Sequence, residues 1–199
     1  MSLSAFETLV RARVSLRRYS EKAVPDDVIL SVVDAARRAP SASNGQPWRF
    51  IAVAGGPARD ALARACFTGL FSATRFAAKA PLIIALCAER AGLMRAAHAV
   101  KDSAMYQLDC GIAGEHLVLR AAELGLGSCW IGWFPRRRAR RALGAPPHVK
   151  VVSLIAIGYP PEDWTRPVRP RRGLSEILFR DRWGRAFPAS DNAEVRSGE

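Results

Sequence analysis

The chain is built around the segment APSASNGQPWRF, residues 39–50. Pro40 ends the helix predicted before it, because proline disfavours the helical conformation of the residue that precedes it. Gly45 lets the backbone approach another group closely, and residues 50–53 are typical of a short buried strand. Short polar side chains that favour turns stand at Ser41, Ser43 and Asn44. The segment is therefore either a ligand-binding cradle or an ordinary connection from a helix to a strand.

Three further segments are short motifs of the same kind. They are RVSLRRY at residues 13–19, GLGSCWIG at residues 125–132 and RRGLSEI at residues 171–177. Together with residues 39–50, and in the same order, they resemble the signatures of the flavin-dependent nitroreductase family. The resemblance extends from about residue 9 to residue 184, which is nearly the whole chain.

The resemblance implies an α+β fold of the nitroreductase type. We expect a central mixed β-sheet of about four or five strands wrapped by helices. A single domain is expected over residues 1–187, with a C-terminal arm that crosses to a partner subunit and a flexible tail at residues 188–199. The family relationship also implies a homodimer with the cofactor FMN held between the two chains.

The matched motifs assign roles to individual residues. Arg13, Ser15 and Arg171 match positions that hold the FMN phosphate, and Arg17 matches the position near the N1 and O2 edge of the flavin. The cradle at residues 41–46 matches the part that the second subunit contributes, and the backbone at residues 131–132 faces flavin N5. The full set of predicted cofactor-binding residues is Arg13, Val14, Ser15, Arg17, Pro40, Ser41, Ser43, Asn44, Gln46, Ile131, Gly132 and Arg171. Val14 departs from the arginine usual in the family, and Gly173 from its proline.

The activity implied by the family is a flavin-dependent oxidoreduction, and no catalytic side chain is predicted. NADH or NADPH reduces the flavin by hydride transfer, and the flavin then reduces a nitro compound or a quinone in a ping-pong cycle. The G-x-G at residues 125–127 follows a helix and precedes a strand, so it is not a dinucleotide fingerprint, and the nicotinamide is expected to bind only transiently. Reductive dehalogenation, flavin cleavage, or non-catalytic binding of flavin or nucleic acid are the alternatives.

The composition favours a cytoplasmic protein with one sizeable core. Of the 199 residues, 49% are hydrophobic, yet we find no apolar run long enough for a membrane span and no secretory signal. The net charge of +12 comes mostly from arginine, which is densest at residues 136–141. This cluster is either a nucleic-acid contact or a solvated helix face, and we favour the helix face. The four cysteines form no C-x-x-C pair, so neither a metal site nor a disulfide framework is expected; Cys87 and Cys129 are predicted to be buried thiols.

Hydrophobic periodicity places the remaining elements. Helices are predicted at residues 3–13, 25–39, 58–65, 136–143 and 100–124, and strands at residues 50–53, 81–87, 128–133 and 150–159. A short strand at residues 177–179 is expected to join a partner subunit, and residues 91–97 are shorter than the pocket cover of family members. The long helix carries candidates for burial at Met105, Leu108, Ile112, Leu119 and Leu124. Its small residues, Gly111, Ala113 and Gly114, allow close packing of another helix, either across a dimer interface or within one chain.

Overall fold

The structure is a computed structural model that describes residues 3–89 and 105–188. The chain forms two compact units, residues 1–164 and residues 165–199, which are described separately. The first unit contains the helices α1 (Ala5–Ala12), α2 (Asp26–Arg37), η1 (Ala42–Asn44), α3 (Gly56–Cys66), η2 (Gly69–Lys79), α5 (Met105–Glu123) and α6 (Arg136–Ala142). Its strands are β1 (Trp48–Val53), β2 (Leu82–Ala88), β3 (Gly127–Ile131) and β4 (Lys150–Gly158). The expected α+β class is confirmed.

The four strands form one sheet in the order β1-β2-β4-β3. All three strand pairings are antiparallel, with Phe50 opposite Leu86 between β1 and β2, and Ile84 opposite Ile155 between β2 and β4. The expectation of a mixed sheet is thus wrong for the named strands. Among residues 3–89 and 105–188, parallel pairing is limited to an isolated bridge between Ser15 and Ser128. The apolar runs indicated buried strands correctly, but such runs carry no information on strand direction.

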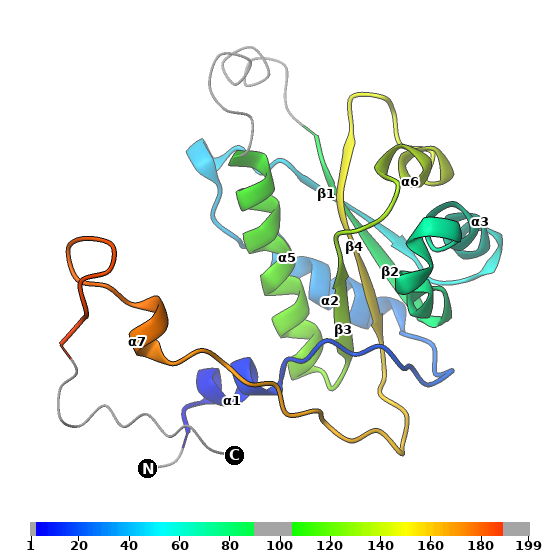
Figure 1. Ribbon diagram of the computed structural model, residues 1–199. Helices are drawn as coiled ribbons and strands as arrows, with labels where there is room; N and C mark the ends of the chain where they lie inside the picture. The colour runs from blue at the N-terminus through cyan, green and yellow to red at the C-terminus, as the bar shows by residue number, and fades with distance from the viewer. Residues whose placement is uncertain (1–2, 90–104, 189–199) are drawn as a thin grey trace. The chain divides into compact units, whose positions relative to one another are not determined.

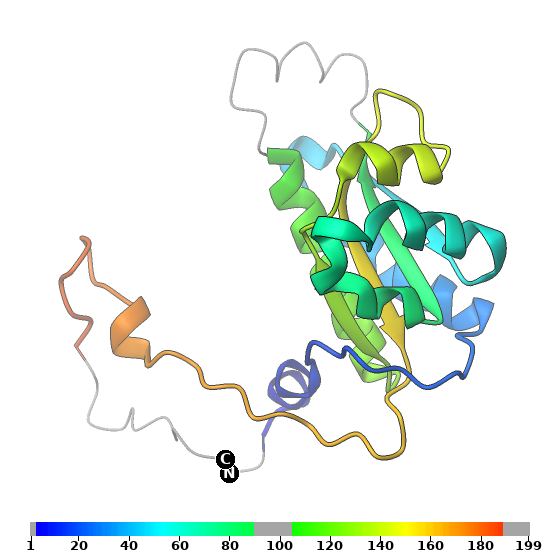
Figure 2. The same ribbon diagram turned by 45° about the vertical axis from the view of Figure 1, so that its right-hand side comes forward.

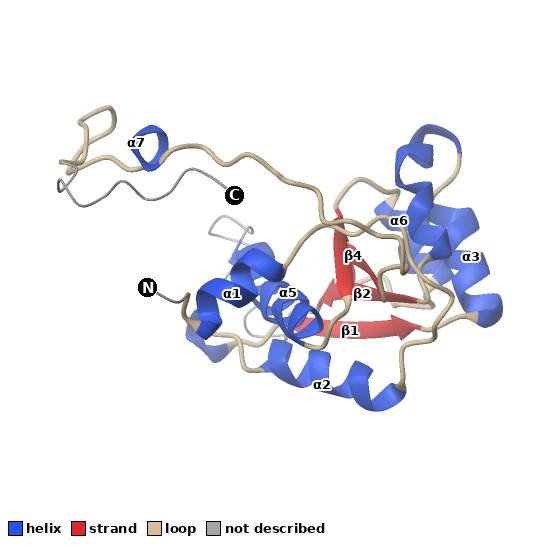
Figure 3. Ribbon diagram, turned by 90° about the horizontal axis from the view of Figure 1, so that it is seen from below, coloured by secondary structure: helices blue, strands red, loops and turns tan. Residues whose placement is uncertain are grey.

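Helices cover both faces of the sheet (Figures 1 and 2), which explains why every residue of β2 is buried. Successive side chains of a strand point to opposite faces. Accordingly, Ile83 and Ala85 pack with α3, η2 and α6, whereas Leu82 and Ile84 pack with α2 and α5. The view from below shows α2 and α5 running across one side of the strands (Figure 3). The sheet therefore has an apolar core on each of its two faces.

The long helix α5 differs from its prediction in which residues it buries. Its buried side contains Asp109, Cys110, Ala113, Gly114, Leu117, Val118 and Ala121. Met105 and Leu108, predicted to be buried, are 44% and 58% exposed. A Cβ at Gly114 would lie 2.2 Å from Cη2 of Trp130, so this glycine accommodates an indole of the same chain rather than a second helix. The described part of the predicted helix is helical, but its buried side is formed by Leu117, Val118 and several small residues rather than by Met105 and Leu108.

The arginine-rich helix α6 begins after Pro135 as predicted. Its first residue, Arg136, binds a part of β4 that β3 does not pair with. Because β3 stops at Ile131, the first residues of β4 extend past it. Arg136 donates hydrogen bonds from Nη1 to the carbonyl oxygens of Val151, at 2.9 Å, and Val152. The cluster is therefore only partly a solvated face, since Arg136 binds backbone carbonyls of the sheet.

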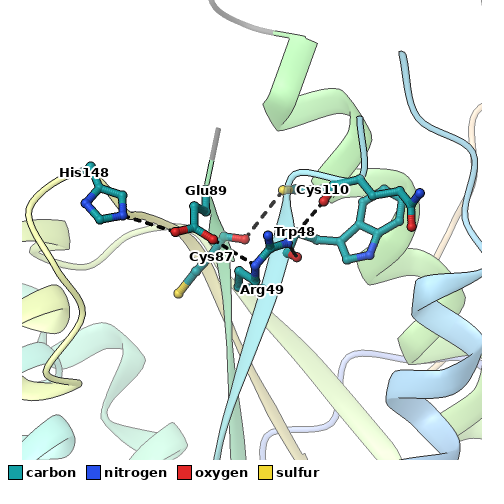
Figure 4. Close-up of polar contacts among 7 residues, drawn as sticks. Trp48, Arg49, Cys87, Glu89, Cys110 and His148 are labelled. Atoms are coloured by element: carbon teal, nitrogen blue, oxygen red, sulfur yellow. Dashed lines mark hydrogen bonds and ion pairs between the residues drawn. The ribbon is translucent and has the colours of Figure 1, made fainter. Parts of the chain in front are cut away.

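Glu89, the residue that follows β2, connects the end of this strand to β1 and to the segment before β4 (Figure 4). Its carboxylate lies 3.0 Å from Nε of Arg49 on β1 and 3.1 Å from Nε2 of His148, which precedes β4. Nearby, Sγ of Cys110 points to the carbonyl oxygen of Cys87 at 3.9 Å. All four cysteines are buried and free, as predicted for Cys87 and Cys129.

The second unit contains the short helix α7 (Leu174–Ile177). Phe179 forms an isolated bridge with Ala186, and its ring packs on Trp183 at a centroid distance of 4.8 Å. The predicted strand at residues 177–179 is therefore wrong in this chain, because Ile177 ends a helix and Phe179 pairs locally. The expectations for residues 91–97 and for the tail from residue 189 onward lie outside the described residues. No helix in the described part of the chain has both the length and the apolar character that crossing a membrane requires.

Candidate functional site

The cradle at residues 41–46 contains an unusual density of left-handed backbone. Ser43, Asn44 and Gln46 have φ angles of 52°, 51° and 41°, a region that residues with a side chain rarely occupy. Gly45, expected to supply the backbone freedom, has an ordinary φ of −71°. Such conformations persist only where the surroundings hold them, and they concentrate at functional sites. The three side chains of these strained residues are exposed, so they are available to a ligand.

Hydrogen bonds inside the cradle hold this conformation. The backbone N–H of Gln46 donates to Oγ of Ser41 at 3.0 Å, and the N–H of Asn44 donates to the Ser41 carbonyl oxygen at 3.0 Å. The side-chain amide of Gln46 donates to Oδ1 of Asn44, also at 3.0 Å. Ser41 thus has a structural role in shaping the loop. Pro40, also predicted as a site residue, is exposed at the start of the same segment.

A residue that the sequence analysis missed ties the cradle to the core. The backbone N–H of Ala42 donates to Oδ1 of Asp109 at 3.1 Å. Asp109 lies on α5 and is only 6% exposed. A buried carboxylate requires such a partner. The sequence did contain a sign of this role, because Asp109 is a charged residue among the small and apolar residues of the long helix.

The predicted arginine segment, residues 13–17, runs along the edge strand β3. The N–H of Leu16 donates to the carbonyl oxygen of Ser128 at 2.9 Å, and Ser15 pairs with Ser128 in the parallel bridge. Leu16 is 1% exposed, while Ser15 and Arg17 on either side of it point outward. The structure therefore brings this motif next to the GLGSCWIG motif, as expected for two parts of one site. Val14 is half-buried in the same segment.

The Tyr19 hydroxyl and the Cys129 thiol lie beneath this segment and do not neutralise its positive charge. Burial raises the pKa values of the Tyr19 hydroxyl and the Cys129 thiol, and Arg17 only partly opposes this effect. The Tyr19 hydroxyl also donates to the carbonyl oxygen of Leu16 at 2.7 Å. Both groups are therefore neutral at physiological pH. Arg17 itself lies over the ring of Phe76, with the guanidinium carbon 5.7 Å from the ring centroid.

The end of β3 provides the third part of the candidate site. Ile131 is buried and Gly132 is exposed, with open space where a Cβ would be. The next residue, Trp133, is 51% exposed, and its ring lies 5.3 Å from that of Phe71 on η2. Arg75 is exposed on the same element, η2. The exposed backbone beside an aromatic pair is suited to a flat, aromatic ligand.

The single chain places the cradle and the arginine segment at two separate points of α5. Asp109 holds the cradle near the start of the helix, whereas Arg13 forms an ion pair with Glu115, with Nε 3.8 Å from Oε1. Six residues correspond to about 9 Å along a helix axis. Figure 1 shows η1 beside one end of α5 and α1 beside the other. Arg171 belongs to the second unit, where it is exposed.

The described residues include hydrogen-bond donors suited to an anion, but no group of side chains suited to ligating a metal ion. Two guanidinium groups and a hydroxyl lie on residues 13–17, which is a chemistry suited to phosphate oxygens. Within residues 3–89 and 105–188, no three His, Cys, Asp or Glu side chains are grouped to hold a metal ion.

Comparisons with known proteins agree with this geometry. The sequence model of the nitroreductase family matches residues 10–159. A protein of Archaeoglobus fulgidus named for NADH dehydrogenase and NAD(P)H nitroreductase is 31% identical over 179 residues, which cover 88% of this chain and 97% of the relative. The crystal structure of a nitroreductase family protein from Clostridium novyi has a TM-score of 0.70 at 29% identity and covers 92% of this chain and 97% of that one.

A further solved structure carries a ligand. A Desulfovibrio desulfuricans protein described as a nitroreductase was crystallised in complex with FMN. It is 27% identical, has a TM-score of 0.71 and covers 94% of this chain and 100% of that one. The match of the family model over most of the first unit, and the similarity of relatives along nearly their whole length, show that this chain belongs to the nitroreductase family.

Proposed function

We propose that this protein is an FMN-dependent oxidoreductase that uses NADH or NADPH to reduce nitroaromatic compounds, quinones or related electrophiles. The observation that carries the proposal is the docking of residues 13–17 on β3. It sets two arginines and a serine along the strand that ends one residue before the exposed Gly132. FMN would supply two-electron redox chemistry, for which the side chains of this chain have no substitute.

The residues present fit this cofactor. In the proposal Arg13, Ser15 and Arg171 bind the phosphate, since guanidinium groups bind phosphate oxygens bidentately. Arg17 stabilises negative charge at the N1 and O2 edge, and the backbone at Gly132 faces N5. The strained cradle, held by Ser41 and Asp109, presents the side chains of Asn44 and Gln46 to the same flavin from the second subunit.

We further propose that the working unit is a cytoplasmic homodimer. The separation of the cradle from the arginine segment along α5 supports a site completed by two chains. Large apolar side chains are exposed on α1 and at the start of α5, with Phe6 at 67% and Leu108 at 58%. Apolar patches of this kind are typical of interaction surfaces.

Two measurements test the proposed cofactor and the proposed dimer. The purified protein is denatured and the released flavin is chromatographed, with FMN expected at one per chain and FAD or no flavin contradicting the proposal. Sedimentation over a dilution series, read at protein and flavin wavelengths, should then show that dimer and FMN are lost together, because their coupling is reciprocal. A monomer that keeps FMN would contradict the shared site.

Turnover kinetics test the reaction itself. Donor and acceptor are proposed to occupy the same place in alternation, since the chain has no dinucleotide fingerprint. Double-reciprocal plots at several concentrations of a nitroaromatic acceptor should give parallel lines. Lines that intersect would instead indicate a ternary complex.

A further inference from the structure

An acidic side chain lies inside the basic part of the candidate site. Glu115 on α5 has Oε1 3.8 Å from Nε of Arg13, and the two side chains are 47% and 23% exposed. The separation exceeds hydrogen-bonding distance, so the contact is an ion pair without a directed bond. In the proposed function, Arg13 is a ligand of the phosphate, which is also an anion.

The surroundings of Glu115 keep its carboxylate near Arg13. Trp130 of β3 lies against α5 at Gly114, and its indole, together with Arg13 and His116, favours the charged form of Glu115. Partial burial outweighs these three influences, so the pKa of Glu115 is raised above its usual value. The carboxylate is therefore held between the arginine segment and β3 and accepts a proton more readily than an exposed glutamate.

We propose that Glu115 competes with the phosphate of the cofactor for Arg13 and thereby limits the affinity of the flavin site. The inference rests on the proposed function, because it takes Arg13 as a phosphate ligand. A phosphate monoester carries between one and two negative charges near neutral pH, so it repels a neighbouring carboxylate. Binding of FMN must then either separate Arg13 from Glu115 or place a proton on Glu115.

The test compares Glu115→Gln with wild-type protein from which flavin has been removed. FMN is titrated and followed by quenching of its fluorescence, with riboflavin, which lacks the phosphate, as the ligand control. Removing one like charge beside the phosphate should tighten FMN binding by about tenfold at pH 7.5 and leave riboflavin binding unchanged. Glu123→Gln on the same helix, where Glu123 pairs with Arg120, is the matched protein control and should change neither affinity.

Calorimetry gives a second reading that does not depend on affinity. Titrations of FMN in two buffers of different ionisation enthalpy report the protons taken up on binding. Wild-type protein should take up more protons than Glu115→Gln between pH 5 and about pH 7, because a bound phosphate raises the pKa of a nearby carboxyl group. In an Arg13→Ala background, Glu115→Gln should tighten FMN binding less than it does in the wild-type background, because the competition for Arg13 is gone and only the repulsion between carboxylate and phosphate remains.

The outcomes separate this inference from the proposed function. FMN binding that is unchanged or weaker in Glu115→Gln, with a normal unfolding midpoint, would overturn the competition and leave the flavoprotein assignment intact. If the glutamine variant is unstable, Glu115→Ala must show the tightening instead, and its failure to do so is equally decisive. A wild-type protein that binds no FMN would overturn both proposals.

Discussion

Gly127 and Leu16 are packed so closely that a Cβ at Gly127 would lie 2.3 Å from Cδ2 of Leu16. Gly127→Ala must therefore push the arginine segment away from β3. We expect a loss of about 1–3 kcal/mol in the free energy of unfolding, as for other overpacked sites, together with weaker flavin binding. Urea denaturation and flavin titration measure the two effects. Gly111→Ala is the control, since open space surrounds that helical glycine and alanine should stabilise it by up to about 1 kcal/mol.

Asp109 should matter to the site although it touches no ligand in the proposal. Asp109→Ala removes the acceptor for the Ala42 N–H and leaves that donor without its partner, at a cost of about 1–3 kcal/mol. Hydrogen exchange at the Ala42 amide should accelerate, and the affinity for flavin should fall. Asp109→Asn keeps a side-chain oxygen and should retain much of the protection. Equal exchange rates in the alanine variant and wild type would contradict the assigned role.

Arg17 is expected to set the reduction potential of the bound flavin. Two-electron reduction leaves negative charge near N1 and O2, and a fixed cation there favours the reduced form. About 30 mV corresponds to 1.4 kcal/mol for two electrons, so Arg17→Ala should lower the potential by tens of millivolts. The measurement is a spectrophotometric redox titration. Arg18→Ala is the control, because Arg18 is exposed and pairs with Asp163.

The link at Glu89 should contribute to stability in a pH-dependent way. Its hydrogen bond with His148 and the charge of Arg49 lower the pKa of Glu89 below its usual value. A carboxylate with a depressed pKa stabilises the fold above its unfolded pKa, near 4.3, and the contribution is lost as the pH falls through the folded value. Glu89→Gln should therefore be less stable than wild type at pH 6, and the difference should shrink as the pH falls below the unfolded pKa and vanish below the folded one. A difference that persists in acid would show that packing, rather than charge, is responsible.

Sequence reasoning located the elements because each has a local cause. Pro40 and Pro135 mark helix ends, and the apolar run of residues 81–87 became the inner strand β2. What it missed depends on contacts between distant residues. Asp109 under the cradle is such a contact, and so is Trp130 against Gly114. No periodicity records which partner a residue will meet across the core.

The sequence likewise identified some of the site residues but did not reveal the conformation of others. The motif at residues 13–17 was identified through its resemblance to the family, and the structure places Ser15 of this motif in a bridge with Ser128 of β3. The conformation of the cradle could not be read from composition, because the left-handed positions are Ser43, Asn44 and Gln46 while Gly45 is ordinary. A glycine in the sequence marks a position where left-handed backbone costs little free energy. A functional site, however, can hold other residues in the same conformation.

The short strand β3 leaves part of its neighbour open, and Arg136 occupies that opening. Unpaired carbonyls at the margin of a sheet are a template on which another chain can add a strand. The guanidinium group takes up those acceptors and brings a positive charge that repels the same margin of a second molecule. One of the many arginines thus occupies backbone acceptors at the margin of the sheet, a role unrelated to any ligand.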